Sequence, residues 1–229
     1  MKIHRFFTTA FTEEAHTITL TDREVLHQIT KVLRLTPGET IAVCPGTGEE
    51  LRVTIASITK NILVGTLTEK STHNNTSLAP VTLYLAILKR ENFELALQKA
   101  VEIGINTIVP LVTARTVKTG LNYTRLNKII KEASEQSGRT TLAELGAITQ
   151  FRDAVTNAST HGKMVLCDPS GTEKIVPGQC SLFIGPEGGF TSEEIVYAKD
   201  GGAHIANLGT TILRGETAAI VASYTATHQ

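Results

Sequence analysis

The feature that most constrains the fold of this chain is an apolar run that ends in a glycine-rich loop. Residues 182–184 read as a buried strand, and residues 185–190, with the sequence GPEGGF, follow at once. Residues 191–194 (TSEE) then have the S/T-x-x-E form of a capping box, which predicts that a helix begins there. A strand that passes through such a loop into a helix is typical of α/β proteins, whose ligands sit outside the carboxyl ends of the strands. The sequence therefore predicts a ligand site at this loop.

Strands and helices alternate through the rest of the C-terminal region. Apolar residues recur at helical spacing between Asn92 and Gly104, which should cap and end one helix, and again between residues 122 and 137. A last helix should run from about residue 216 to residue 227. This alternation predicts a mostly parallel sheet that helices cover on both faces. The expected strands are residues 81–88, 107–112, 164–167, 182–184 and 204–208.

The N-terminal region has a different pattern. Short runs rich in β-branched residues, at 17–20, 40–43 and 51–55, are separated by the turn sequences PG and PGTG. They predict a small β-barrel with one helical stretch between Asp22 and Leu33. A polar segment then reads as a linker. We therefore expect a β-barrel domain over residues 1–72, a linker over residues 73–80 and an α/β domain over residues 81–229.

The composition is that of an ordinary globular protein. Of the 229 residues 41% are hydrophobic, yet no apolar stretch approaches the roughly 18 residues of a membrane-spanning helix. Polar residues interrupt the first segment too soon for a signal peptide, so we expect a cytoplasmic protein without a membrane partner. The three cysteines and seven histidines show no C-x-x-C or H-E-x-x-H spacing, so neither a disulfide framework nor a metal site is expected.

Charge sets a further limit on the partners. The 22 basic and 22 acidic residues give a formal net charge of zero, which argues against nucleic-acid binding by bulk electrostatics. Any contact with RNA should therefore be local. Each candidate cation, taken singly, reads more readily as part of a solvated surface. The cations near the motifs are Arg5, Arg34, Lys89, Arg90, Arg115, Lys118 and Arg139.

The glycine-rich loop allows three interpretations. It can be no more than a tight strand-to-helix turn, because glycines permit positive φ. It can be a phosphate-binding loop, but it lacks the G-K-[ST] ending, and Glu187 places an anion where a phosphate needs donors. A P-loop nucleotidase is therefore disfavoured. An uncharged heteroaromatic ligand with a thioether or sulfonium centre fits this loop better.

A second loop, over residues 207–218, links the next expected strand to the last helix. It again places glycine beside functional groups, of which Arg214 and Glu216 are the notable ones. The alternative is a surface ion pair, with Glu216 in the first helical turn, where the helix dipole favours an anion. From the residues of this loop alone, both interpretations stay open.

Together the two loops resemble a known family. GPEGGF at 185–190 and LG-x-x-ILR-x-ETA at 208–218 closely resemble motifs of the bacterial ribosomal RNA small subunit methyltransferase E family, within the SPOUT superfamily. ALQKAVEIGI at 96–105 and EASEQSGR at 132–139 are similar to two further family motifs, and RFF at 5–7 extends the similarity to the N-terminal region. The resemblance thus covers nearly the whole chain in the expected order.

The resemblance implies an α/β fold in which a C-terminal SPOUT domain carries a deep trefoil knot and a small N-terminal PUA-like β-barrel binds RNA. It implies a homodimer that uses S-adenosylmethionine as methyl donor and methylates N3 of one uridine in the 16S rRNA of the small ribosomal subunit. Because that nitrogen carries a proton, a base or a stabiliser of the developing anion is expected. A base inside a stem must be splayed out first, which favours single-stranded or loop RNA.

The candidate site residues follow from the resemblance and from this chemistry. We expect Arg214 to stabilise the anionic uracil or a nearby phosphate. Glu216 or Glu135 should act as base or orient an arginine, and the sequence does not choose between them. The expected RNA contacts are Arg5, Arg34, Lys89, Arg90, Arg115 and Arg139, and the guanidinium groups of the five arginines suit phosphates. The expected cofactor contacts are Leu166, Ile184, Gly185, Pro186, Glu187, Gly188, Leu208, Gly209, Ile212 and Leu213.

Two departures from the family pattern keep alternatives open. Thr211 stands where family members commonly have arginine, and Gly215 stands where a residue such as Ala or Thr is usual. Neither removes Arg214 or Glu216. The alternatives are a SPOUT methyltransferase that acts on a ribose 2′-oxygen or another base, and a non-catalytic RNA-binding or ribosome-assembly protein that keeps the fold.

Overall fold

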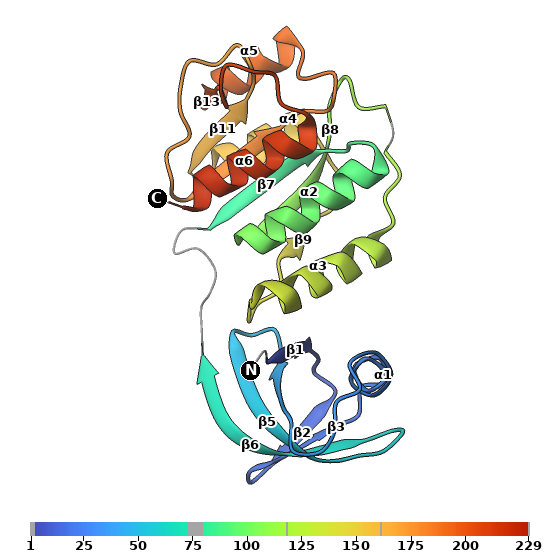
Figure 1. The fold of residues 1–229 in the computed structure, drawn as a ribbon. Coiled ribbons are helices and arrows are strands. Elements are labelled where there is room, and N and C mark those ends of the chain that lie inside the picture. Colours follow the sequence, from blue (N-terminus) through green and yellow to red (C-terminus); the bar gives the residue numbers. More distant parts are fainter. Residues whose placement is uncertain (1–2, 73–79, 118, 161, 229) are drawn as a thin grey trace. The chain divides into compact units, whose positions relative to one another are not determined.

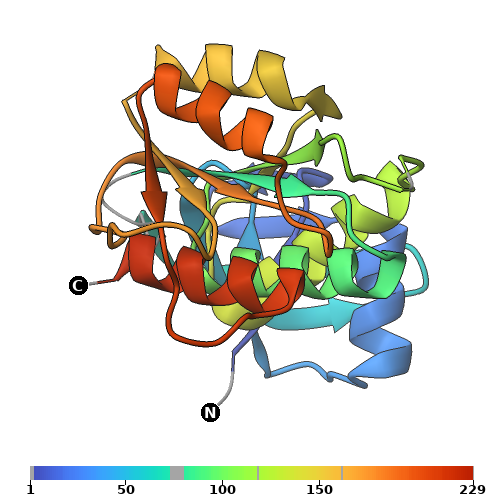
Figure 2. The same cartoon turned by 90° about the horizontal axis from the view of Figure 1, so that it is seen from above.

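The computed structural model describes residues 3–72, 80–117, 119–160 and 162–228 of the chain. The chain divides into two compact units. The first comprises Met1–Asn75 together with Ser134–Leu142, and the second comprises Thr76–Ala133 and Ala143–Gln229. Figures 1 and 2 show the fold from directions 90° apart. Apart from Pro80, the expected linker lies outside the described residues, as does Lys118.

A six-stranded sheet with the order β1-β4-β5-β6-β3-β2 forms the first unit. β1 pairs with β4 in parallel, and the other neighbours pair antiparallel. Alternate side chains of these strands, among them Phe6, Ile18 and Ile41, point into one core and are fully buried. The strands predicted from the β-branched runs are thereby confirmed. The bounds are β1 His4–Phe7, β2 Phe11–Glu14, β3 Thr17–Leu20, β4 Thr40–Cys44, β5 Glu49–Ile58 and β6 Leu63–Thr72.

The expected helical stretch after Asp22 is present but changes its geometry midway. Helix α1, Arg23–His27, begins where the Asp22 carboxylate accepts hydrogen bonds from the next backbone amides, and a π-helical turn, Gln28–Val32, continues it. The wider turn shifts the helical register, and Val32 at its end is 65% exposed although it is apolar. Arg34 follows with a left-handed φ of 55°.

One segment of the first unit comes from far along the sequence. The amide of Phe7 donates to the Glu135 carboxylate over 3.0 Å, and the amide of Gly48 donates to the Thr140 carbonyl over 3.2 Å. Thr47 and Thr141 form an isolated β-bridge. These bonds place the end of helix α3, Tyr123–Ser137, and the residues after it with the first unit, although the sequence suggested the second.

The second unit is built on a parallel sheet with the order β10-β8-β7-β12-β11-β13, in which β9 also pairs with β8. All of its strand pairs are parallel. Its central strands are nearly continuous apolar runs, as a sheet covered on both faces requires. The bounds are β7 Val81–Ala86, β8 Thr107–Val112, β9 Glu144–Leu145, β10 Thr149–Gln150, β11 Lys163–Cys167, β12 Cys180–Ile184 and β13 Ala203–Ala206.

Helices cover both faces of this sheet, as the alternating pattern predicted (Figure 2). Leu83 and Leu85 of β7 pack in a core with residues of α2, Arg90–Ile103, and α6, Gly215–Thr227. Tyr84 points the other way, into a second core with residues of α4, Phe151–Ser159, and α5, Ser192–Asp200. Helix α4 was not expected from the sequence, although its apolar residues lie at helical spacing.

The helix ends test the capping predictions. The capping box is confirmed: the Thr191 hydroxyl accepts from the Glu194 amide, and the Glu194 carboxylate accepts from the Thr191 amide. Gly104 ends α2 with a φ of 108°, which favours glycine. Asn92 does not cap α2, because the helix already begins at Arg90.

The connection into α6 runs across the sheet. β13 lies at the sheet edge beside β11, whereas α6 packs against α2 and against the central strands β7 and β12. The chain between them, residues 207–214, therefore returns from the edge to the middle of the unit. The trefoil knot that the resemblance implies stays a prediction. Among the described residues, no helix is long and apolar enough to cross a membrane.

Candidate functional site

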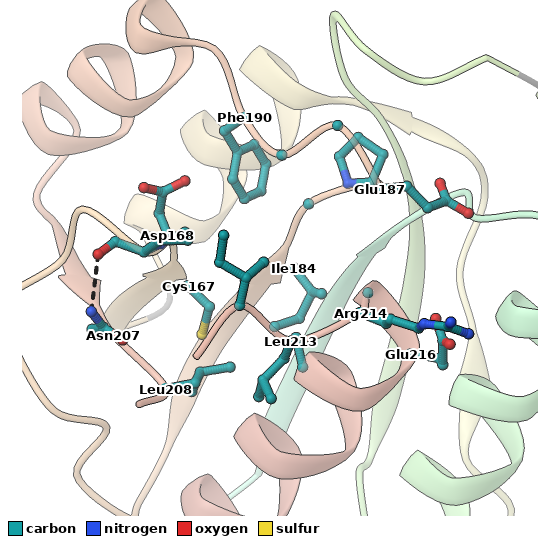
Figure 3. Close-up of a pocket in the computed structure, with 18 of the residues that line it drawn as sticks. Cys167, Asp168, Ile184, Glu187, Phe190, Asn207, Leu208, Leu213, Arg214 and Glu216 are labelled. Carbon is teal, nitrogen blue, oxygen red and sulfur yellow. Dashed lines mark hydrogen bonds between the residues drawn. The ribbon is translucent and has the colours of Figure 1, made fainter. Parts of the chain in front are cut away.

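The second unit contains a cavity of about 1000 Å³ at the carboxyl ends of its strands (Figure 3). Three loops form it: those that follow β11, β12 and β13. Ligands of open α/β sheets bind at this position. The glycine-rich loop after β12 and the loop after β13, both identified in the sequence, meet there. The lining residues are 167–170, 184–190, 207–216, Lys89, Asn92, Arg115 and Ala218.

Glycines set the shape of the loop after β12. A Cβ atom at Gly185 would lie 3.1 Å from the Phe190 ring, and Gly189 has a φ of 71°. The amide of Gly189 donates to the Pro186 carbonyl over 2.8 Å, which closes a tight turn. The buried Phe190 ring packs over the start of the loop. A side chain at Gly185 would therefore crowd the Phe190 ring, and one at Gly189 would strain the backbone.

Arg115, which also lines the pocket, holds the same loop in place. Its guanidinium Nη1 donates to the carbonyls of Gly188 and Phe190 over 2.6 and 3.3 Å. The neighbouring amide of Ala114 donates to the Glu194 carboxylate over 2.8 Å. Arg115 was expected to bind RNA. Its hydrogen bonds instead stabilise the conformation of the loop after β12, which is expected to bind the cofactor.

Glu187 has a structural partner as well. Its carboxylate Oε1 accepts a hydrogen bond from the amide of Lys89 over 3.1 Å, at the N-terminus of α2. The negative charge lies where the helix dipole is favourable. The Glu187 carboxylate therefore connects the loop after β12 to α2. The exposed Lys89 side chain lies at the rim of the pocket.

Asn207 joins the other two walls of the pocket. Its side-chain nitrogen Nδ2 donates to the Pro169 carbonyl, and its oxygen Oδ1 accepts from the Gly209 amide, each over 2.9 Å (Figure 3). Gly209 has a φ of 143°. The loops after β11 and β13 are thus connected by one amide side chain. Asn207 was not among the expected site residues.

Arg214 and Glu216 lie together at the start of α6 (Figure 3). Arg214 is exposed, whereas Glu216 is 8% exposed and lies in the first helical turn. The Glu216 oxygen Oε2 is buried and has no hydrogen-bond partner among the described residues. A buried acceptor of this kind is costly unless a ligand or substrate supplies a donor.

The Gly215 departure has a packing explanation. A Cβ atom at this position would lie 2.8 Å from Cδ2 of Leu88, which is buried at the end of the segment before α2. In this chain the leucine side chain occupies the space that a larger residue 215 would need. Thr211, the second departure, is exposed on the loop and lines the pocket.

Leu166 does not form a pocket wall as expected. Its side chain is fully buried in the core between β11, α4 and α5, because successive residues of a strand face opposite sides of the sheet. Its neighbour Cys167 lines the pocket instead. Burial raises the pKa of the Cys167 thiol to about 12, so the group stays protonated and offers a weakly polar surface.

Four pocket residues at the carboxyl end of β11 were not expected from the sequence: Cys167, the last residue of the strand, and Asp168, Pro169 and Ser170 after it. Their strand had been predicted, and its carboxyl end adjoins that of β12 in the parallel pair. The rule that ligands bind at carboxyl strand ends therefore carried the signal. What the sequence lacked was the order of the strands in the sheet.

The other expected cofactor contacts all line the cavity. Their exposure differs widely, because Ile184 is buried at the end of β12 and Ile212 is 86% exposed. These residues are Ile184, Gly185, Pro186, Glu187, Gly188, Leu208, Gly209, Ile212 and Leu213.

Glu135 is not one of the residues that line the pocket. Its carboxylate belongs to the first unit, where it accepts a hydrogen bond from the amide of Phe7. Of the two expected bases, Glu216 is thus the one placed at the cavity. Glu135 has a structural contact instead.

Two expected RNA contacts of the first unit are engaged within the protein. Arg139 is 3% exposed, and its Nε donates to the Thr141 carbonyl over 3.2 Å, which removes the physical basis for a phosphate contact. Arg5 donates from Nε to the buried Glu50 carboxylate over 2.8 Å. Arg34, by contrast, is exposed.

Arg90 lies at the first turn of α2 with a side chain that is 72% exposed. It shares Glu94 with Arg125, which binds that carboxylate with two nitrogen atoms over 2.6 and 2.7 Å. Arg90 therefore bonds to Glu94 through one nitrogen atom and still presents a cation near the pocket residues Lys89 and Asn92.

The comparisons with known proteins agree with this site. Residues 74–227 match the family model of an RNA methyltransferase domain. The ribosomal RNA small subunit methyltransferase E of Rickettsia conorii is 31% identical over 97% of this chain and 94% of its own length. The enzyme of the same name from Bacillus subtilis is 30% identical over 92% and 89% of the two chains.

Solved structures give the same result. The methyltransferase E of Neisseria gonorrhoeae, bound to S-adenosylmethionine, superposes with a TM-score of 0.88 at 26% identity and covers 97% of this chain and 95% of that one. A methyltransferase of Legionella pneumophila in complex with the same cofactor gives a TM-score of 0.86 at 27% identity, over 97% and 96% of the two chains. The chain therefore belongs to the ribosomal RNA small subunit methyltransferase E family.

Proposed function

We propose that this protein transfers a methyl group from S-adenosylmethionine to N3 of a uridine in the 16S rRNA of the small ribosomal subunit. The observation that carries the proposal is the cavity between the loops after β11, β12 and β13, in a chain of this family. Two relatives with the same fold bind S-adenosylmethionine. A substrate in ribosomal subunits also accounts for the expected cytoplasmic location.

The residues of the cavity fit this cofactor. Ile184, Leu208 and Leu213 give apolar surface for an adenine ring, and the volume of about 1000 Å³ accommodates a ligand of this size. Gly185 and Gly209 let the main chain approach a flat ligand. When bound, the cofactor supplies an electrophilic methyl group on a sulfonium centre.

The chain contributes orientation and charge at the acceptor. Arg214, exposed at the start of α6, is placed to stabilise the anion that develops on the uracil ring. The proton of uridine N3 would pass to Oε2 of Glu216, the buried oxygen that has no partner among the described residues. Holding the acceptor and the methyl group in line accounts for the rest of the rate, an effect of up to about 7–11 kcal/mol in favourable cases.

RNA recognition divides between the two units in this proposal. Lys89 and Arg90 offer cations beside the pocket, and Arg34 offers an exposed guanidinium on the PUA-like first unit. A uridine within a stem would have to be extruded before its N3 could reach the cavity, so an unpaired uridine is the expected target. The homodimer stays a prediction of the resemblance, which sedimentation of the purified protein would test.

Transfer of label tests the proposal. Small ribosomal subunits from cells that lack this modification are incubated with S-adenosylmethionine labelled in its methyl group and with either the protein or an R214A variant. We expect label in 16S rRNA with the unchanged protein and about 100-fold slower labelling with R214A. Absence of label under conditions where calorimetry shows cofactor binding would contradict the proposed substrate.

A further inference from the structure

We propose that Asp168 is a cofactor-binding residue whose carboxylate accepts a hydrogen bond from the ribose hydroxyls of S-adenosylmethionine. The inference rests on the proposed function and deepens it. Asp168 is half-buried at the carboxyl end of β11, lines the cavity and was not anticipated in the sequence. It is one of three acidic residues there, with Glu187 and Glu216.

The other two acids have different tasks. Glu187 is anchored by the amide of Lys89, and Glu216 lies in the first turn of α6 beside Arg214. Figure 3 shows Arg214 and Glu216 on one side of the pocket and Asp168 on the other, near Phe190 and Asn207. Because the uridine is proposed to react near Arg214, Asp168 lies away from the reacting end of the site.

The Asp168 carboxylate is held in place from one side. Its Oδ1 accepts from the Ser170 amide over 2.9 Å and from the Ser170 hydroxyl over 2.6 Å. The Asp168 amide donates to the Ala206 carbonyl over 3.0 Å. Among the described residues, the hydrogen bonds to this carboxylate all reach Oδ1, so Oδ2 keeps its capacity to accept.

Asn207 fixes the next residue of the same loop through its bond to the Pro169 carbonyl. The loop that carries Asp168 is thus tied to β13 at two neighbouring points, by the Asp168 amide and by the Asn207 side chain. An acceptor whose conformation is fixed before binding loses little entropy when a ligand donates to it.

Charge decides which part of the cofactor suits this position. The amino-acid end carries an ammonium group and a carboxylate, and its carboxylate needs a cation and would be repelled by a neighbouring Asp168. Among the described residues that line the pocket, the cations are Lys89, Arg115 and Arg214, which lie at the start of α2, against the β12 loop and at the start of α6. The amino-acid end is better accommodated on that side.

The adenosine half is uncharged and offers two vicinal hydroxyl donors on its ribose. A carboxylate that follows a strand is a common partner for the ribose of nucleotide cofactors in α/β proteins. Asp168 has the required chemistry and place: an acceptor at a strand end, one oxygen fixed and one open. The structure thereby assigns the ribose to the β11 side of the cavity.

Calorimetry of the binding of cofactor analogues tests this assignment. D168N is the informative variant, because the asparagine side chain has the same shape but replaces the open acceptor Oδ2 with an NH2 donor. We expect D168N to bind S-adenosylhomocysteine about 10- to 100-fold more weakly than the unchanged protein does. The same loss should appear with 5′-methylthioadenosine, which keeps the ribose but lacks the amino-acid end. With a 2′,3′-dideoxy analogue the two proteins should bind equally.

D153N is the matched control, because it removes one acidic charge from α4 in the same unit, away from the pocket. It should leave all affinities unchanged. Equal loss with the dideoxy analogue, or no loss with 5′-methylthioadenosine, would overturn the assignment to the ribose. If the unchanged protein bound none of these ligands, the proposed function itself would fail.

A second pair of variants covers the case in which D168N does not fold. N207A releases the Pro169 carbonyl and the Gly209 amide but keeps the Asp168 charge. N106A removes a similar amide, whose Oδ1 accepts from the Val81 amide at the opposite ends of the strands. We expect N207A to weaken S-adenosylhomocysteine binding several-fold and N106A to leave it unchanged. Equal effects of the two variants would overturn the argument.

Discussion

At the scale of single residues, the start of α6 gives different surroundings to Arg214 and Glu216, which the sequence places in one loop. Arg214 is exposed, and Glu216 buries an oxygen without a partner among the described residues. An exposed cation can meet the substrate, and a buried acceptor can receive a proton or a hydrogen bond from it. Substitutions of Arg214 or Glu216 should therefore slow the chemical step more than they weaken cofactor binding.

Replacing Glu216 by Gln tests the assignment of the base. The substitution keeps the shape of the side chain but removes its basicity, so single-turnover methylation should fall by about 100-fold or more. Cofactor affinity, measured by calorimetry, should change little.

The matched control for E216Q is E135Q. Glu135 accepts a bond from the Phe7 amide, and the side-chain carbonyl oxygen of the substituted glutamine would keep an acceptor there. The E135Q variant should therefore methylate at nearly the normal rate. A slow E135Q together with a normal E216Q would reverse the assignment of the two carboxylates.

Residue-level predictions from sequence succeeded where local pattern decides and failed where burial decides. The two glycine-bearing loops were found because glycine, strand end and helix start are neighbours in the sequence. The roles of Arg115 and Glu135 required knowledge of distant partners, and that of Arg139 required knowledge of its burial. Phe7, for instance, is 128 positions from Glu135. No local pattern reports such a bond.

At the scale of elements, the contact between α6 and the segment before α2 predicts an effect of Gly215. A G215A variant should lose about 1–3 kcal/mol of unfolding free energy, because its Cβ would lie 2.8 Å from Leu88 Cδ2. Denaturant titration measures the loss. In an L88A background the cost of G215A should largely disappear.

The control for G215A is G120A, since a Cβ atom at Gly120 would meet open space. It should leave the free energy of unfolding nearly unchanged. A similar cost for G215A with Leu88 and with alanine at position 88 would show that the close approach is not the cause.

Helices α2 and α3 are joined by an ion pair whose effect depends on pH. The hydrogen bond from Arg125 is the main cause that lowers the pKa of Glu94, and Arg90 adds to it. Because the folded-state pKa is lowered, the stabilisation is present above the unfolded pKa of about 4.3 and is lost as the pH falls through the folded value.

An R125A variant should therefore unfold at a modestly lower temperature than the unchanged protein at pH 7, as is usual for partly exposed pairs. The difference should vanish once acid has protonated Glu94. The control is K128A, which removes an amino group that lies 3.9 Å from the exposed Glu132 carboxylate. It should have little effect on the unfolding temperature. A difference between R125A and the unchanged protein that persisted in acid would contradict this account.

Most elements followed from the sequence, and the exceptions have physical reasons. Asp22 begins α1 as expected, but the π-helical turn after it depends on packing that no periodicity records. Helix α4 was missed although Phe151, Ala154, Val155 and Ala158 lie on one face. Its remaining residues include Thr, Asn and Ser, which favour helices weakly, so the apolar spacing had little support.

At the scale of the whole molecule, the alternation of strands and helices predicted a parallel sheet with both faces covered, and the structure confirms it. The order of the strands was not predictable from pattern. It decides the site, because β12 lies between β7 and β11 and so brings the loops after β11 and β12 together. The residues after β11 were missed for that reason.

The acceptor atom, N3 of a uridine in 16S rRNA, is the part of the proposed function that can be tested most directly. The most direct measurement is to incubate the purified protein with S-adenosylmethionine and unmodified small subunits, digest the RNA and identify the methylated nucleoside by mass spectrometry. We predict 3-methyluridine, formed with the unchanged protein and strongly reduced with E216Q. A methyl group on a ribose oxygen or on another base would contradict the claim.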